Sequence, residues 1–329
     1  MKRLVLQNRK VWAEDVADPA AEREWVVVKV AAAPICGSDK GAYCGEAPAR
    51  YAGHEGSGVV AEAAGSSKLS AGDRVILNPL TGCGKCALCL TGNYIYCREQ
   101  SPPSSYFAQY VRVQDFVCTA LPDDISFELG SLACCTFGPA FNIIKRMNIK
   151  AFDTLVITGL GPVGMGALTI AKFLGARVIA LDTVPFRKNM AEALGADAVI
   201  DAADPDARRL IAEAAKPARV TRAVDASGNA AAERLLIDVT EPTGIVAFIG
   251  ENQGDIPVSP SRDFIRKGLT LMGAWHYNIS DREEMLTLLR RSPLAPKLIT
   301  DVYGFSDVQA AFDKFIGGDV CKVILKPWE

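Results

Sequence analysis

The sequence predicts an α/β protein with two domains, one built on a parallel sheet and the other rich in strands. The chain has 329 residues, which is longer than one hydrophobic core usually supports. From about residue 154 onward, short apolar runs alternate with helical stretches, whereas the amino-terminal region is rich in Gly, Pro and strand-like runs. Hydrophobic residues make up 49% of the chain, which is enough apolar material to fill two cores.

The predicted elements follow that division along the chain. The clearest strand of the amino-terminal region is EWVVVKVAAAP at 24–34, and helices of the second region are expected to begin at Val163 and at about Pro185. Continuous apolar strands separated by helices of about ten residues predict a parallel sheet covered on both faces. The predicted strands of this sheet are TLVIT at 154–158, RVIALD at 177–182, AVID at 198–201, RAVDAS at 222–227, GIVAFIG at 244–250 and LTLMGAW at 269–275.

Charge and hydropathy exclude several classes of partner. The formal net charge is −2, and no run of Lys or Arg has the length typical of a nucleic-acid footprint. The amino terminus has only the apolar run LVL before Gln7, too short for a secretory signal, and no apolar run reaches the ~18 residues of a membrane span. We therefore expect a cytoplasmic protein that binds neither nucleic acid nor membrane. Thiols stay reduced there, and clustered cysteines more often bind metal than pair.

Four cysteines are clustered in the stretch GCGKCALCLTGNYIYC, residues 82–97. The short spacing of Cys83, Cys86, Cys89 and Cys97 lets a loop fold its thiolates around one zinc ion, and the neighbouring glycines relieve the tight backbone. Because four sulfur ligands leave no open coordination position, this zinc is predicted to be structural. The alternative is four reduced thiols in a loop.

A glycine-rich turn follows the first predicted strand of the parallel sheet. Gly159, Gly161 and Gly164 form a G-x-G-x-x-G pattern before a helix, and Asp182 ends the next strand, 18 residues past Gly164. In a Rossmann domain such glycines let the backbone approach a pyrophosphate at the positive end of the helix, and the acidic residue accepts hydrogen bonds from the adenosine ribose. The alternative is a tight turn without a ligand, with Asp182 capping the next helix.

The end of the second strand also bears on the choice of dinucleotide. The carboxylate of Asp182 would repel the 2′-phosphate of NADP, which favours NAD. Arg187 and Lys188 follow a few residues later, and their positive charges keep NADP as the alternative.

The amino-terminal region offers side chains for a second, open metal centre. ICGSDKGAYC supplies Cys36, Ser38 and Asp39, and YAGHEGSGVV supplies His54 and Glu55. The chain has only two histidines, and this one has a carboxylate beside it and glycines around it, a combination suited to metal binding. On its own, the combination does not decide the matter.

Six motifs occur in a recognisable order along the chain. They are C-G-S-D, G-H-E, the four-cysteine loop, G-D-R-V at 72–75, G-x-G-x-x-G at 159–164 and the closing CKVILKP. This order resembles that of the zinc-dependent medium-chain dehydrogenases, the superfamily of alcohol, sorbitol and threonine dehydrogenases. The resemblance covers essentially the whole chain, and it is specific for the superfamily but not for a substrate.

The resemblance implies a GroES-like catalytic domain around a Rossmann NAD-binding domain. Members of the superfamily usually form dimers or tetramers through the Rossmann domain, so a homodimer or homotetramer is expected. The expected boundaries are 1–135 and 276–329 for the GroES-like domain, 82–97 for the structural zinc lobe within it, and 136–275 for the Rossmann domain.

Site roles follow from the resemblance at matching positions. Cys36 and His54 look like ligands of a catalytic zinc, and Ser38 like the hydroxyl that passes the substrate's proton toward solvent. Asp39 resembles the carboxylate that orients His54. Glu55 corresponds to a glutamate that binds zinc in some members and stands behind it in others. A polar turn or helix cap is the alternative for Ser38 and Asp39.

The third zinc ligand is expected in LACCTFGPAFN, where relatives carry Cys, Glu or Asp. Counting back from Gly159 and matching TFGPAFN to the family's helix favours Cys135, with Cys134 or Glu55 as alternates. Two zinc ions per chain are therefore expected.

Cofactor contacts are implied for the glycine turn, the acidic strand end and the strand of MGAWHYN, whose backbone resembles the one that meets the nicotinamide amide. For the histidine of that strand, packing or an interface is favoured over a direct catalytic role. The implied cofactor-binding residues are Gly159, Gly161, Pro162, Val163, Gly164, Asp182, Arg187, Ala274 and His276.

These assignments imply a zinc-dependent oxidoreductase that transfers hydride between a small alcohol and NAD. SFELG and TFGPAFN resemble polyol and threonine dehydrogenases, so a secondary alcohol of polyol or amino-alcohol type is expected. The alternatives are an aldehyde or ketone reductase using NADPH, and a non-catalytic NAD-binding zinc protein. Two departures stand out: Gly41 replaces a histidine found in several relatives, and the segment after Cys97 is shorter than usual, which predicts a pocket open to bulkier alcohols.

Overall fold

The computed structural model describes residues 1–65, 68–100 and 104–329, which form two compact units. The first unit comprises Met1–Cys135, Asn278–Arg291 and Ile299–Glu329, and the second comprises Thr136–Tyr277 and Ser292–Leu298. The sequence analysis assigned 292–298 to the carboxy-terminal part of the other domain. The structure groups them with the second unit because the short 3₁₀ helix η5 (Ala295–Leu298) packs against helix α5 (Pro162–Phe173).

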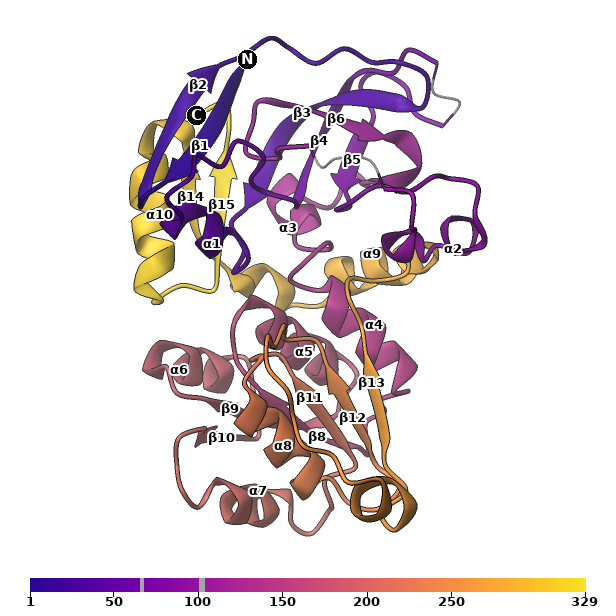
Figure 1. Ribbon diagram of the computed structural model, residues 1–329, viewed down its shortest axis with the longest axis vertical. Coiled ribbons are helices and arrows are strands. Elements are labelled where there is room, and N and C mark those ends of the chain that lie inside the picture. Colours follow the sequence, from indigo (N-terminus) through magenta and orange to yellow (C-terminus); the bar gives the residue numbers. More distant parts are fainter. Residues whose placement is uncertain (66–67, 101–103) are drawn as a thin grey trace. The chain divides into compact units, whose positions relative to one another are not determined.

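The second unit is built on a six-stranded sheet in which every neighbouring pair is parallel (Figure 1). Its strand order is β10-β9-β8-β11-β12-β13, which is the order of a Rossmann domain. The first three strands are added toward one edge of the sheet and the last three toward the other, so the order reverses between β8 and β11. The strands are β8 (Thr154–Thr158), β9 (Arg177–Asp182), β10 (Ala198–Asp201), β11 (Arg222–Asp225), β12 (Ile245–Phe248) and β13 (Thr270–Gly273).

The predicted parallel sheet is therefore confirmed, and its first three strands have the predicted bounds. The last three are shorter than predicted because the chain turns out of the sheet at their ends. After β11, for example, the Asp225 carboxylate accepts hydrogen bonds from the Ser227 hydroxyl and the Gly228 N–H. The helices of this unit are α4 (Gly138–Arg146), α5, α6 (Pro185–Ala193), α7 (Ala207–Ala215), α8 (Ala230–Val239), the π-helix η3 (Pro260–Ile265) and η5.

The first unit is rich in strands, as predicted. Strand β3 (Trp25–Pro34) pairs antiparallel with β4, β6 and β15, and is the strand on which the larger, seven-stranded sheet of this unit is organised. The other strands are β1 (Lys2–Gln7), β2 (Lys10–Asp15), β4 (Gly56–Glu62), β5 (Arg74–Leu77), β6 (Tyr110–Gln114), β7 (Cys118–Ala120), β14 (Ile299–Gly304) and β15 (Lys322–Lys326).

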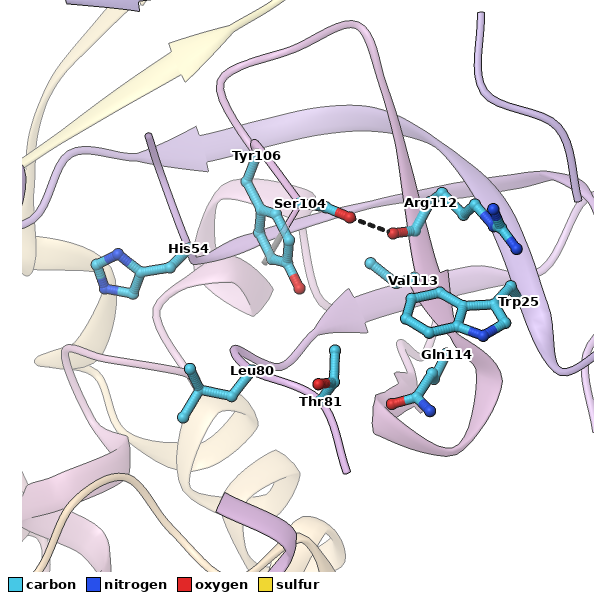
Figure 2. A pocket seen from close by; sticks show the side chains of 9 residues that line it. All are labelled: Trp25, His54, Leu80, Thr81, Ser104, Tyr106, Arg112, Val113 and Gln114. Atoms are coloured by element: carbon cyan, nitrogen blue, oxygen red, sulfur yellow. Dashed lines mark hydrogen bonds between the residues drawn. The ribbon is translucent and has the colours of Figure 1, made fainter. Parts of the chain in front are cut away.

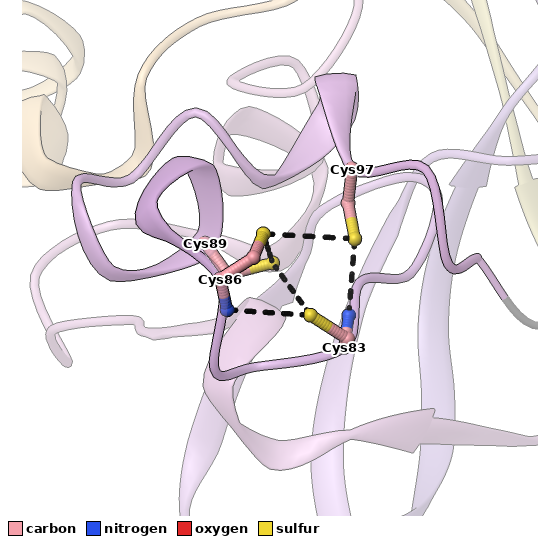
Figure 3. A group of neighbouring side chains, drawn as sticks. All are labelled: Cys83, Cys86, Cys89 and Cys97. Carbon is pink, nitrogen blue, oxygen red and sulfur yellow. Dashed lines mark hydrogen bonds between the residues drawn. The ribbon is translucent and has the colours of Figure 1, made fainter.

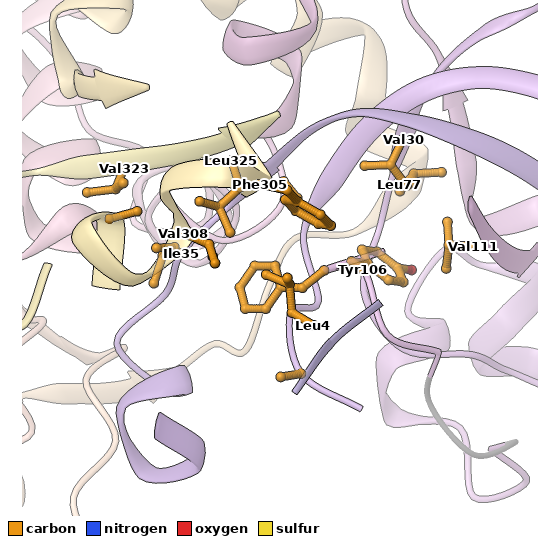
Figure 4. Packing of buried hydrophobic residues seen from close by; sticks show 14 of the residues in the cluster. Leu4, Val30, Ile35, Leu77, Tyr106, Val111, Phe305, Val308, Val323 and Leu325 are labelled. Atoms are coloured by element: carbon orange, nitrogen blue, oxygen red, sulfur yellow. The ribbon is translucent and has the colours of Figure 1, made fainter. Parts of the chain in front are cut away.

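The two ends of the chain share one core in this unit (Figure 4). Leu4, Val30 and Ile35 from the amino-terminal part are buried in the same cluster as Phe305 and Leu325 from the carboxy-terminal part. Burying side chains of this size contributes about 1.5–3 kcal/mol each. The carboxy-terminal strands are therefore an integral part of this unit, because their side chains fill its core. Its helices are α1 (Asp39–Cys44), α2 (Ala87–Leu90), η1 (Tyr94–Tyr96), η2 (Asp115–Val117), α3 (Phe127–Ser131), η4 (Ile279–Asp281), α9 (Arg282–Arg291), η6 (Phe305–Asp307) and α10 (Val308–Gly317).

None of the helices in the described parts of the chain combines the length and the apolar character needed to cross a membrane.

Candidate active site and metal centres

Four side chains from distant parts of the first unit meet in one cluster. Ligand atoms of Cys36, His54, Glu55 and Cys135 all lie within 4.8 Å of one another, and the Sγ atoms of Cys36 and Cys135 are 3.4 Å apart. We call these four residues the mixed cluster. All four were expected from the sequence as ligands or alternates of a catalytic zinc, and the structure brings them together.

Neighbouring strands and one glycine position this cluster. Cys36 follows the end of β3, and His54 and Glu55 directly precede β4, which pairs with β3. Gly53 has a φ of +75°, and a Cβ at this position would lie 2.6 Å from the ring of Phe107. Glycine is therefore required here, both for the left-handed backbone and for the close approach to the buried phenylalanine.

The two adjacent cysteines point to different places. The thiol of Cys134 lies 2.9 Å from the backbone carbonyl of Leu77 at the end of β5, to which it donates. Cys135 instead contributes its Sγ to the mixed cluster. Of the two residues, the structure thus brings only the one favoured by the sequence analysis into the mixed cluster.

Asp39 joins the two backbone segments that carry Cys36 and His54. Its carboxylate accepts hydrogen bonds from the backbone N–H groups of Cys36 at 2.8 Å and Gly53 at 3.2 Å. Among the hydrogen bonds of the described residues, none joins it to the His54 ring. Asp39 thus fixes the two backbone segments that carry the ligands rather than the imidazole itself. Ser38 precedes helix α1, is exposed, and makes no capping hydrogen bond.

A buried ion pair joins Glu55 of the mixed cluster to a lysine outside it. The Lys322 ammonium contacts the Oε1 of Glu55, and both side chains are fully buried. Sequence reasoning missed Lys322, which lies 267 residues from Glu55. The one available signal was a charged residue at the start of the otherwise apolar stretch VIL.

Burial and charge shift the titration of the mixed cluster in opposing directions. A hydrogen bond from Cys135 lowers the pKa of the Cys36 thiol well below its usual value. Burial by itself would lower the pKa of His54, but the hydrogen bond and the negative charge of Cys36 outweigh it and raise that pKa to about 9. Burial raises the pKa of Glu55 to about 7, against the positive charge of Lys322. An ionised thiol in this setting is the form that binds a metal.

The other cluster is formed by four cysteines in one loop (Figure 3), which we call the cysteine lobe. Its ligand atoms, from Cys83, Cys86, Cys89 and Cys97, also lie within 4.8 Å of one another. The backbone N–H of Cys86 donates to the Cys83 sulfur, and that of Cys83 donates to the Cys97 sulfur, both at 3.3 Å. Backbone N–H groups of Lys85 and Cys86 lower the pKa of Cys83 to about 7.

Two polar side chains anchor the cysteine lobe to the rest of its unit. Gln114 on β6 accepts from the Gly82 N–H and donates to the Gly82 carbonyl. Asn278 donates to the Thr91 carbonyl at 2.9 Å. A Cβ on Gly92 would lie 2.0 Å from the Oδ1 of Asn278, so this contact also requires glycine.

Both clusters fit a zinc ion by the chemistry of their donors. Thiolate and imidazole are the ligands that zinc takes in proteins. The cysteine lobe offers four thiolates and suits a closed, structural site. The mixed cluster offers two thiols, one imidazole and one carboxylate, the kind of set that leaves a position for a further ligand when three of them bind.

In the second unit, the glycine-rich turn follows β8, which lies where the strand order of the sheet reverses. Gly159 has a φ of +82°, and a Cβ on it would lie 2.5 Å from the Ser227 nitrogen. A Cβ on Gly164 would lie 1.8 Å from the Gly159 carbonyl oxygen. At Gly161, by contrast, a Cβ would meet no described atom within 4 Å. The first and third glycines therefore allow the tight turn and the close helix packing, and Gly161, followed by Pro162 and Val163 in the first turn of α5, leaves room for a phosphate to approach.

Asp182 makes its hydrogen bonds to backbone groups on both sides of the end of β9. It ends β9, and its carboxylate accepts hydrogen bonds from the N–H groups of Leu160 in the glycine turn and Val184 before α6. The Arg187 guanidinium lies 3.6 Å from it. Asp182 therefore holds the glycine turn and the chain before α6 together, but it does not cap that helix, whose N-cap is Val184.

Ala274 and His276 follow the last strand of the parallel sheet. The Ala274 N–H donates to the Phe248 carbonyl at 3.3 Å. His276 is 5% exposed, has a φ of 57°, and its backbone carbonyl accepts from the Asn142 amide. The burial of His276 fits the packing role that was favoured over direct catalysis from the sequence.

Known proteins resemble the chain over both units. A family model described as zinc-binding dehydrogenase matches residues 162–291, and one described as alcohol dehydrogenase GroES-like domain matches residues 22–123. An uncharacterized zinc-type alcohol dehydrogenase-like protein of Escherichia coli strain K12, YphC, is 30% identical over 97% of this chain and 96% of its own. The chain belongs to the zinc-type medium-chain dehydrogenases.

A further relative supports this assignment, and a solved structure supports the fold. Sorbitol dehydrogenase of Bacillus subtilis is 30% identical over 99% of this chain and 97% of its own. An alcohol dehydrogenase from Thermus sp. ATN1 has the same fold, with a TM-score of 0.90 at 24% identity and 99% of each chain covered. The predicted fold class, a GroES-like domain with a Rossmann parallel sheet, is thus confirmed, and the dehydrogenase is an oxidoreductase of the zinc-type alcohol dehydrogenase kind.

The dehydrogenase has a pocket beside the mixed cluster (Figure 2). In this view His54 lies on the left, Trp25 and Arg112 lie on the right, and Tyr106 lies between them. The Arg112 guanidinium lies over the Trp25 ring at 5.2 Å from its centroid. The pocket is lined by Trp25, His54, Leu80, Thr81, Ser104, Tyr106, Arg112, Val113 and Gln114. Residues 101–103 of the segment that the sequence analysis found shortened lie outside the described residues.

Proposed function

We propose that the chain is a zinc-dependent dehydrogenase that transfers hydride between a secondary alcohol and NAD. The observation that carries the proposal is the mixed cluster, in which a thiol, an imidazole, a carboxylate and a second thiol lie within 4.8 Å of one another. A binding scaffold has no need for such a set beside a pocket, because one closed structural site is sufficient to stabilise a loop.

Two zinc ions per chain fit this proposal. Cys36, His54 and Cys135 would hold the catalytic ion, and the cysteine lobe would hold the structural one. When bound, the catalytic zinc supplies a Lewis acid that polarises the substrate oxygen while the nicotinamide exchanges hydride with the carbon.

The remaining steps belong to side chains of the protein. Ser38 has an exposed hydroxyl two residues beyond Cys36, and we assign it the transfer of the substrate's proton to solvent. Asp39 keeps Cys36 and the His54 segment in place through backbone hydrogen bonds. Since Gly41 carries no side chain that can relay a proton, the path beyond Ser38 uses water or the cofactor ribose.

NAD is the proposed cofactor, bound at the glycine turn between 159 and 164. The Asp182 carboxylate is fixed at the end of β9 by two backbone N–H groups, so a 2′-phosphate placed beside it would meet a negative charge that cannot move away. The second candidate is a carbonyl reductase using NADPH. It is favoured by the Arg187 guanidinium, whose Nε is buried and has no hydrogen-bond partner among the described residues.

The proposed substrate is a secondary alcohol with further hydroxyl or amino groups. The likeness to a protein named sorbitol dehydrogenase supports this class. We also propose that the chain forms a homodimer or homotetramer. Its proposed location is the cytoplasm, where cysteine ligands stay reduced. The domain bounds at 135 and 276 are likewise proposed.

A substrate screen combined with a metal count tests the proposal. Secondary alcohols and polyols would be offered with NAD and with NADP, and the absorbance of the reduced cofactor followed, while zinc per chain is measured on the same sample. We expect two zinc ions, faster reduction of NAD than of NADP, and a preference for polyols over ethanol. One zinc per chain and no turnover would identify a non-catalytic scaffold, and a preference for NADPH with aldehydes would identify the reductase. Equal rates with ethanol would contradict the substrate class.

A further inference from the structure

Helix α1 buries two of its six residues, Asp39 and Tyr43. They are four positions apart and therefore lie on the same face of the helix. Asp39 joins the backbone of Cys36 to that of Gly53, next to the mixed cluster. Tyr43, one turn further along, lies against helix α10. This short helix thus connects the mixed cluster to a helix 270 residues further along the chain.

Three side chains of α10 meet Tyr43. The Tyr43 hydroxyl donates to the Oδ1 of Asp313 at 2.6 Å and accepts from the Nε2 of Gln309 at 2.9 Å. The ring of Phe312 stacks on the Tyr43 ring, with the centroids 5.1 Å apart and the planes 22° from parallel. Gln309, Phe312 and Asp313 follow the three- and four-residue spacing of one helix face. That face therefore holds Tyr43 both by its ring and by its hydroxyl.

Phe312 also reaches the segment that carries His54. Its ring meets the ring of Phe107 edge-on, with the centroids 5.8 Å apart and the planes at 90°. The Phe107 N–H donates to the Ala52 carbonyl at 3.3 Å, and the Phe107 ring is the one that a Cβ on Gly53 would approach to 2.6 Å. Closely packed interiors have few voids, so a displaced ring displaces its neighbours. A shift of Phe312 would therefore reach the His54 segment as well as α1.

We propose that Tyr43 and Phe312 are positioning residues of the mixed cluster. They fix the two segments that carry Cys36 and His54 relative to each other, α1 through the Tyr43 ring and hydroxyl and the other segment through Phe107. The proposal rests on the proposed function, since it requires a metal at this cluster. These rings supply no ligand to the ion, and they act on its geometry through the backbone segments that they contact.

The test replaces Phe312 by leucine in the full chain and follows the metal itself. Leucine keeps an apolar side chain in the core but loses both ring contacts. The visible spectrum of the cobalt-substituted protein should change because it depends on the coordination geometry. The share of that spectrum due to the mixed cluster is the part lost in Cys36→Ser. Zinc of the mixed cluster should pass to a chromophoric chelator roughly 10-fold faster than in the wild-type chain, as is typical when a group behind a metal ligand is changed.

Turnover supplies a second readout. In Phe312→Leu, kcat should fall roughly 10- to 100-fold, because a small misplacement of the reacting groups is costly even when the changed residue is far from them. The KM for NAD should stay at the wild-type value, since the proposed dinucleotide site lies in the other unit. A plain loss of stability would lower the amount of folded enzyme without changing the cobalt spectrum of the part that remains folded.

Two further variants separate positioning from stabilisation. Tyr43→Phe keeps the ring stack and removes only the hydroxyl, so it should change the spectrum and the zinc release in the same direction but less. It also protects the test if Phe312→Leu fails to fold, because Asp313 keeps its hydrogen bond from Gln309. Phe315→Leu is the matched control. Phe315 lies on α10 and packs against the same core, but the ring contacts of the described residues do not include it, so its spectrum and zinc release should equal those of the wild type.

The outcomes are distinct. A wild-type spectrum and zinc release in Phe312→Leu, or in Tyr43→Phe where Phe312→Leu does not fold, would overturn the positioning role while leaving the proposed function in place. The same changes in Phe315→Leu would also overturn it. A wild-type chain that binds a single metal, in the cysteine lobe, would overturn both. Changes in Phe312→Leu and Tyr43→Phe that are absent from Phe315→Leu support the inference.

Discussion

The mixed cluster and the cysteine lobe differ in how the chain builds them. The cysteine lobe takes all its ligands from the stretch 83–97, and backbone N–H groups of the same stretch donate to its sulfurs. The mixed cluster takes its ligands from three separate segments, near 36, 54 and 135, and its balancing lysine from 322. A site of the first kind stabilises its own loop, whereas a site of the second kind depends on the whole unit being folded.

The difference also shows in the charges. The cysteine lobe has four groups of one type, two of them half-buried. The mixed cluster combines thiol, imidazole and carboxylate with a fully buried lysine. Chemical variety and buried charge are features of reacting sites, where they prepare groups for different tasks. We therefore expect changes at the two clusters to affect different measurable properties.

The largest effect is expected at the mixed cluster. Cys36→Ser should remove one metal per chain and lower kcat/KM by roughly 10³-fold or more, because a Lewis acid contributes several kcal/mol to the transition state. Turnover, zinc content and circular dichroism would be measured together. Cys44→Ser, which changes an exposed cysteine of the following helix, is the control and should leave all three unchanged. Wild-type activity in Cys36→Ser would contradict the view that the mixed cluster is the reacting site.

At the cysteine lobe we expect a loss of stability instead. Cys89→Ala should also remove one metal, and it should lower the free energy of unfolding by several kcal/mol, because a structural zinc contributes directly to folding. Denaturant midpoints and limited proteolysis at 82–97 measure this. Cys118→Ala, at a cysteine outside both clusters, serves as control. The remaining folded enzyme should keep its KM; a large change in KM would show that the two clusters are not separate in function.

A change in the second unit should leave both clusters intact. Asp182→Asn removes the charge that faces a 2′-phosphate, so the KM for NAD should rise roughly 10-fold and the preference over NADP should shrink, as expected for hydrogen bonds to a charged group. Zinc content should not change. Asp201→Asn, at the end of the neighbouring strand β10 and paired with Lys188, is the matched control. Loss of a metal in Asp182→Asn would contradict the separation.

The smallest effect is expected at the anchor of the cysteine lobe. Asn278→Ala removes the hydrogen bond to the Thr91 carbonyl and should cost about 1 kcal/mol. Hydrogen exchange should become faster within 82–97, while turnover stays at the wild-type level. Unchanged exchange would mean that the lobe is held by its sulfurs and its small core alone.

The sequence predicted those features that depend on neighbouring residues. The strands 154–158, 177–182 and 198–201 have the predicted bounds, because each is a short apolar run ended by glycine or a charged residue. The membership of the cysteine lobe likewise follows from spacing. Cys135 was favoured over Cys134 through a family resemblance, since nothing in two adjacent cysteines indicates which one turns toward the metal.

Features that depend on contacts between distant residues were not predicted. The hydrogen-bond partners of Asp39 are an example: its carboxylate binds two backbone N–H groups, and a sequence does not show which donors a buried carboxylate will meet. Lys322 was missed for the same reason, because only the pairing of β15 with β3 brings it to Cys36. The shorter ends of β11 to β13 reflect turns held by side chains such as Asp225.

The order in which a ribosome delivers these residues separates the two clusters in time. All four thiols of the lobe have been synthesised once the chain reaches residue 97, so a metal ion could bind them during synthesis. The mixed cluster gains its third segment at 135 and its buried lysine at 322. The lobe is therefore the first of the two clusters that can form, and the mixed cluster has to wait for a strand that is made more than two hundred residues later.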